Sequence, residues 1–82
     1  METNKYKKGD VLLITYKEDS SGEIITSGVL FDISQLKITL AHNFSEKIPL
    51  DKTILFIKDV INSKIVVPKE LNSINDISDY TL

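Results

Sequence analysis

The chain has 82 residues, of which 41% are hydrophobic and 27% charged, with a formal net charge of −2 and no cysteine. This length suits one small domain, and the composition excludes general disorder, a disulfide framework and a zinc–thiolate site. All ten basic side chains are lysine. The absence of arginine disfavours tight nucleic-acid binding, because arginine supplies the bidentate donors that read guanine and phosphate.

The start of the chain has no apolar segment after its lysines, and no apolar run approaches the roughly 18–20 residues that a membrane helix needs. We therefore expect a cytoplasmic protein. Residues 1–8 form a polar lead-in, residues 9–67 the domain, and residues 68–82 an acidic tail or short helix. The weak helical stripe of the tail has four members: Leu71, Ile74, Ile77 and Tyr80.

Short apolar, β-branched runs separated by turn residues predict an all-β fold. The predicted strands cover residues 11–16, 24–31, 36–42, 53–57 and 62–67. Gly28 falls within the second strand, where glycine is typical of a sharp bend or a close backbone approach. In the third strand, strict alternation predicts Leu36, Ile38 and Leu40 on the inward face. Residues 43–52 are the longest loop, and residues 58–60 have room only for a tight or 3₁₀ turn.

Two stretches give the chain a resemblance to the Sm-like and SH3-like small barrels. Gly28-Val29-Leu30 with the alternation at residues 36–40 is similar to the first block of Sm-like proteins, and residues 55–61 to a degenerate second block. The resemblance implies a five-stranded antiparallel small barrel that can assemble into rings. At the family's RNA-contacting positions this chain has Ser34, Lys37 and Lys58-Asp59, so those contact residues are not carried over.

The polar residues form no visible catalytic or metal-binding constellation. His42 is the only histidine, and a general base or a metal site needs partners that the sequence does not place beside it. Glu18, Asp19 and Glu23 could hold a divalent cation, but they lack calcium-loop spacing and fit a solvated hairpin tip better. We expect no enzyme activity, no cofactor and no metal.

The strongest functional indication comes from the two runs that are apolar on both faces, residues 11–16 and 54–57. One face of such a strand fills the core. The other face must be buried by the tail or by another subunit, since soluble proteins rarely leave an apolar strand exposed to solvent. The candidate interface consists of Ile54, Leu55, Phe56, Ile57, Ile65, Val66 and Val67. We therefore expect a non-catalytic, self-associating binding or scaffold module, with a protein partner also possible. The alternative is a weak RNA-binding Sm-like protein that uses Lys37 and Lys58.

Overall fold

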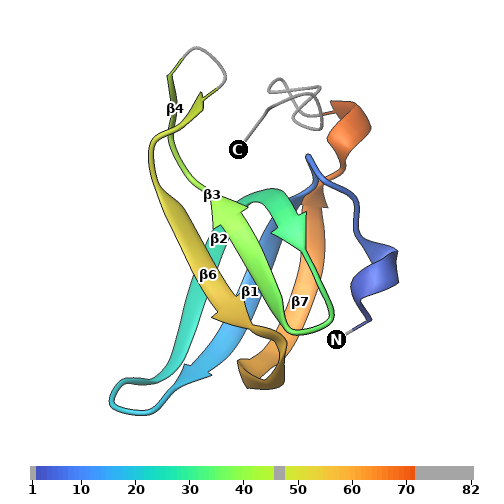
Figure 1. Ribbon diagram of the computed structural model, residues 1–82. Helices are drawn as coiled ribbons and strands as arrows, with labels where there is room; N and C mark the ends of the chain where they lie inside the picture. Colours follow the sequence, from blue (N-terminus) through green and yellow to red (C-terminus); the bar gives the residue numbers. More distant parts are fainter. Residues whose placement is uncertain (1, 46–47, 72–82) are drawn as a thin grey trace.

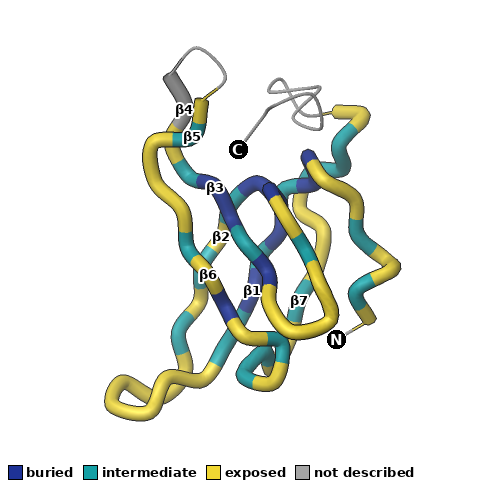
Figure 2. The backbone as a smooth tube through the Cα atoms, viewed as in Figure 1, coloured by how far each residue is buried: buried dark blue, intermediate teal, exposed yellow. Residues whose placement is uncertain are grey.

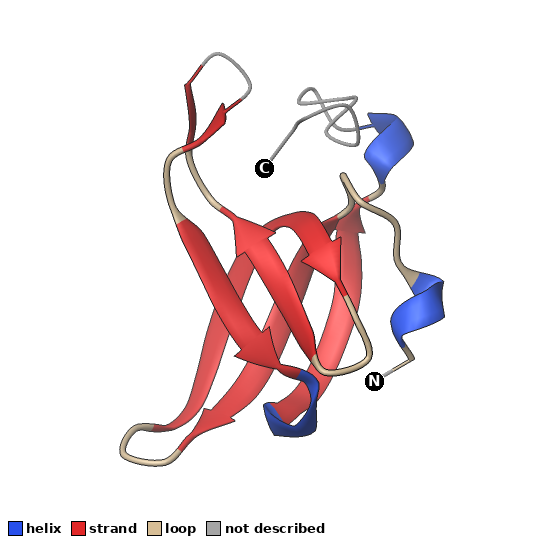
Figure 3. Cartoon of the chain, viewed as in Figure 1, coloured by secondary structure: helices blue, strands red, loops and turns tan. Residues whose placement is uncertain are grey.

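The computed structural model describes residues 2–45 and 48–71, which form an all-β fold with three single-turn 3₁₀ helices (Figure 3). Five antiparallel strands make one sheet in the order β6-β3-β2-β1-β7 (Figure 1). Its strands are β1 Val11–Glu18, β2 Gly22–Ile33, β3 Lys37–Ala41, β6 Lys52–Phe56 and β7 Val60–Val67. A second, two-stranded sheet pairs β4 Phe44–Ser45 with β5 Ile48–Pro49. The 3₁₀ helices are η1 Thr3–Lys5, η2 Ile57–Asp59 and η3 Lys69–Leu71.

The predicted all-β class and five-stranded antiparallel sheet are confirmed, and each strand lies within two residues of its predicted bounds. The predicted 3₁₀ turn is η2, which begins one residue early and takes Ile57 out of the fourth strand. The hairpin β4–β5 was not predicted and occupies the loop at residues 43–52. Within the described residues no ladder joins β6 to β7, so the sheet is open and these two strands are its edges. Ile74, Ile77 and Tyr80 of the predicted tail stripe lie outside the described residues.

The main core is built from the inward faces of the central strands and β6 (Figure 2). Its buried members are Leu12, Ile14, Leu30, Ile38, Leu40 and Leu55. The predicted alternation is correct for Ile38 and Leu40 but wrong for Leu36, whose side chain is 74% exposed. Leu36 precedes β3, in a turn where the Ser34 hydroxyl accepts the backbone N–H groups of Leu36 and Lys37. Strand β3 begins only at Lys37, so the alternation of side chains between the two faces does not extend to Leu36.

A β-bulge interrupts β2 where the strand passes between two groups of buried residues. Leu30 pairs with Leu40 and Asp32 with Thr39, which leaves Phe31 as the extra residue. Such a bulge bends its strand and changes the face to which a side chain points. The bulge lets Leu30 and Ile33, which are three residues apart, both contact the main core. Phe31 packs with Val29 and Ala41 in a second, smaller core.

Gly28 marks a close approach between β2 and β3, as predicted. A Cβ atom at this position would lie 3.0 Å from the Ala41 carbonyl oxygen and 3.1 Å from the His42 ring. We expect Gly28→Val to lower the free energy of unfolding by about 1–3 kcal/mol, because rigid backbone would have to move to admit the side chain. Thermal unfolding measures the effect, with Ser27→Val at the neighbouring exposed position as control. An unchanged melting temperature for Gly28→Val would contradict the close packing.

Candidate functional site

Strand β6 presents an apolar row at one edge of the sheet. The exposed fraction is 57% for Ile54 and 53% for Phe56, whereas Leu55 between them is buried in the core. Ile57 begins η2 and also packs against the core. Of the predicted interface residues in this stretch, Ile54 and Phe56 therefore present side chains outward. Leu55 and Ile57 could contribute to an interface mainly through their backbone groups.

Strand β7 forms the opposite edge and is the least buried strand of the main sheet (Figure 2). Ile65 and Val66 are exposed, and Val67 is half-buried. The β1–β7 register shifts between Leu12–Ile65 and Val11–Val67, which leaves Val66 as a bulge residue with no partner on β1. The N-terminal segment lies beside this strand, and the Tyr6 hydroxyl is 2.7 Å from the Ser63 hydroxyl.

Phe56 separates two surface hollows. A polar slot of about 250 Å³ lies between the end of β1, from Tyr16 to Asp19, and the β6 edge. A mainly apolar groove of about 480 Å³ lies on the other side, where Leu36 and Ile57 join Phe56. The end of β6 thus combines an exposed aromatic ring with accessible concave surface.

The structure brings the two candidate RNA-binding lysines to the same end of the sheet. Lys37 is opposite Phe56 in the β3–β6 ladder, and Lys58 follows Phe56 by two residues, within η2. Lys52 lies at the other end of β6, with its ammonium 5.2 Å from the centre of the Phe31 ring. Asp19 and Asp59 line the slot together with Lys58, so the potential at this end has mixed sign.

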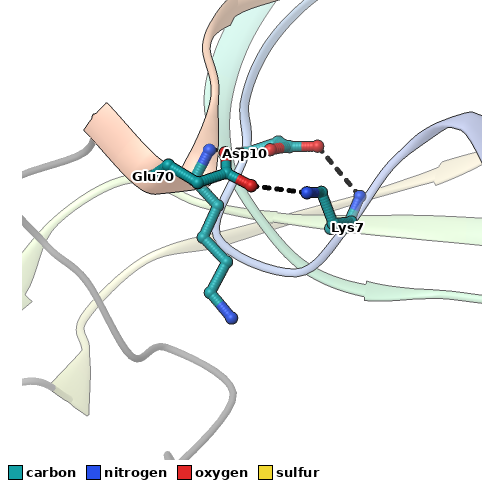
Figure 4. A network of polar contacts seen from close by, with 4 residues as sticks. Lys7, Asp10 and Glu70 are labelled. Carbon is teal, nitrogen blue, oxygen red and sulfur yellow. Dashed lines mark hydrogen bonds and ion pairs between the residues drawn. The ribbon is translucent and has the colours of Figure 1, made fainter.

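A buried carboxylate that the sequence analysis did not single out ties the two ends of the domain together (Figure 4). Asp10 is fully buried, and its Oδ2 accepts the Lys7 backbone N–H at 2.9 Å. Its Oδ1 accepts the Lys69 backbone N–H at 2.8 Å, and its carbonyl accepts the Leu30 N–H at 2.7 Å. Because a buried carboxylate needs such donors, this arrangement is structural.

An exposed ion pair closes the same junction. The Lys7 ammonium is 2.5 Å from Glu70 Oε1, and this hydrogen bond raises the pKa of Lys7 above 10.5 and lowers that of Glu70 below 4.5. The contribution of Glu70 to stability is therefore present above pH 4.5 and lost as pH falls through its lowered pKa. That of Lys7 is present below pH 10.5 and lost as pH rises through its raised pKa. Solvent exposure keeps both contributions small.

His42 and the hairpin carboxylates occupy ordinary structural positions. The His42 Nε2 atom is 2.6 Å from the Thr53 hydroxyl, and the His42 backbone N–H donates to the Asp51 carbonyl. Glu18, Asp19 and Glu23 lie exposed at and beside the β1–β2 turn. Over residues 2–45 and 48–71, no three His, Asp or Glu side chains gather as metal ligands would.

No family model, curated protein or solved structure matches this chain. None of the helices in the described part of the chain has the length and apolar character needed to cross a membrane.

Proposed function

We propose that this chain is a non-catalytic binding or scaffold module of the Sm-like or SH3-like small-barrel type, and that it associates with copies of itself through the edges of its sheet. The observation that carries the proposal is the pair of sheet edges, neither of which has a strand paired to its outer side in the described part of the chain. Exposed apolar side chains line both of them: Ile54 and Phe56 on β6, and Ile61, Ile65 and Val66 on β7.

Sheet edges of this kind favour association, because they present backbone donors and acceptors to any incoming strand. If β6 of one copy pairs with β7 of the next, the sheet continues across the contact and apolar side chains of both edges become buried. The contact is head-to-tail, so repeated copies close into a ring when the rotation allows it. The strand order supports the small-barrel type. In the main sheet β1, β2, β3 and β6 are neighbours in chain order, and the last strand, β7, returns beside β1.

A charge at Phe56 tests the proposed edge contact. We expect Phe56→Glu to raise the dissociation constant for self-association at least about tenfold, because the contact would bury an unpaired carboxylate. The matched control is Ile25→Glu, at a residue 67% exposed on β2, which is not an edge strand. Sedimentation velocity over a concentration series measures both. Equal association of the wild type and Phe56→Glu would contradict an interface at β6.

Weak RNA binding is the second candidate, favoured by the position of Phe56 between Lys37 and Lys58. An aromatic ring with flanking cations can stack a base and contact phosphate. The missing arginine and the acidic neighbours make binding tighter than about micromolar unexpected near physiological salt. Fluorescence anisotropy with a uridine-rich oligonucleotide, repeated at several salt concentrations, separates the two candidates. Nanomolar, strongly salt-dependent binding of the oligonucleotide would contradict the scaffold proposal and favour RNA binding.

A further inference from the structure

The N-terminal segment, residues 2–6, follows the outer edge of β7 (Figure 1). Two hollows of about 170 and 410 Å³ separate it from the strand. Glu2, Lys5 and Tyr6 face Val60–Ser63 across the first, and Lys5 and Tyr6 face Ser63–Ile65 across the second. The segment therefore lies alongside β7 from Val60 to Ile65, and Tyr6 is turned toward the core.

Tyr6 is the main attachment of this segment to β7. Its ring packs against the main core, and its hydroxyl is hydrogen-bonded to that of Ser63 at 2.7 Å. The preceding turn η1 buries no residue, and its Lys5–Glu2 ion pair is long, at 3.9 Å, and exposed. Beyond Tyr6 the chain is fixed at Lys7 by Asp10 and Glu70. Residues 2–5 are thus held beside β7 chiefly through Tyr6.

A strand from a second copy would have to enter the space that this segment occupies. Strand β1 pairs along one side of β7, so only the outer side can accept a partner. We propose that residues 2–6 act as a strap that competes with β6 of a second copy for the edge of β7. Self-association is then limited by release of Tyr6 from Ser63. This inference rests on the proposed function, since it concerns access to the same edge.

Removal of the Tyr6 hydroxyl tests the strap. Tyr6→Phe keeps the ring in the core and loses only the bond to Ser63, so the association constant should rise about fivefold. Ser63→Ala should have the same effect. The double variant should associate little more tightly than either single variant, because both substitutions remove the same hydrogen bond. Ser27→Ala is the control, since it removes an exposed hydroxyl from β2, which is not an edge strand, and should leave association unchanged.

The possible results distinguish a failure of the strap proposal from a failure of the proposed edge contact. If the wild type associates and Phe56→Glu weakens association, but Tyr6→Phe associates no more tightly than the wild type, the strap is wrong and the edge contact stands. If the wild type and the Tyr6→Phe variant are monomeric at every concentration, both fail. Tighter association of Tyr6→Phe and Ser63→Ala, with Ser27→Ala unchanged, supports the strap.

Discussion

Replacement of Leu40 with alanine is expected to lower the free energy of unfolding by about 2–5 kcal/mol. Leu40 is fully buried in the main core, opposite Leu30 in the β2–β3 ladder. The substitution removes buried methyl groups and leaves a cavity that the surrounding strands can fill only in part. A domain of this size has a total stability of about 4–12 kcal/mol, so the variant should approach global unfolding at moderate denaturant. Urea denaturation followed by circular dichroism measures the change.

Leu36→Ala is the matched control, because the alternating pattern places Leu36 and Leu40 on the same face. The structure instead leaves Leu36 exposed in the turn before β3. We expect its replacement to change stability by less than about 0.5 kcal/mol. Equal losses at the two positions would show that the third strand begins earlier than Lys37 and that Leu36 is a core residue.

Asp10→Ala is expected to destabilise the domain by about 2–4 kcal/mol, because two backbone amides lose a charged acceptor at a junction with little access to water. The loss should also loosen both ends of the domain, since one amide belongs to Lys7 and the other to Lys69. Amide hydrogen exchange should therefore accelerate at both residues. Equilibrium unfolding measures the stability change itself.

Asp32→Ala provides the comparison for Asp10. Asp32 is exposed, and its carboxylate accepts the adjacent Ile33 N–H, with the Lys8 ammonium 4.0 Å away. Its replacement should change stability by less than about 0.5 kcal/mol. Similar effects of Asp10→Ala and Asp32→Ala would mean that the buried junction contributes little to folding.

The pattern of neighbouring residues was enough to predict the five strands of the main sheet. Apolar runs bounded by turn residues placed all five, and the glycine within the second strand indicated its close approach to the third. Both signals lie within a few residues of the feature that they predict. The misplacement of Leu36 shows the limit of this reasoning, because alternation cannot say at which residue the pleat begins.

Contacts between distant residues could not be predicted in the same way. The bond from Lys69 to Asp10 spans 59 residues and that between Tyr6 and Ser63 spans 57. Asp10 follows Gly9 directly before a strand, which is typical of a local turn but carries no information about η3. The hairpin β4–β5 has only two residues on each side, too few for a periodic pattern.

For the candidate site, the sequence identified the edge strands but not the faces of their side chains. Ile54 and Phe56 could have filled the core, with Leu55 and Ile57 outside. The β3–β6 register decides between the two, because it places Leu55 opposite the buried Ile38 and Phe56 opposite Lys37. The side chains available for association on β6 are therefore Ile54 and Phe56.

Sedimentation velocity of the full chain, at concentrations from about one to one hundred micromolar, tests the proposed association most directly. We predict a species whose mass is a multiple of 9.3 kDa and whose share rises with concentration. The same experiment on residues 1–71, which keep η3 and its bond to Asp10, tests whether the rest of the tail covers the apolar edges. A full chain that remains at 9.3 kDa throughout, together with a shortened chain that self-associates, would contradict the proposed edge-to-edge contact.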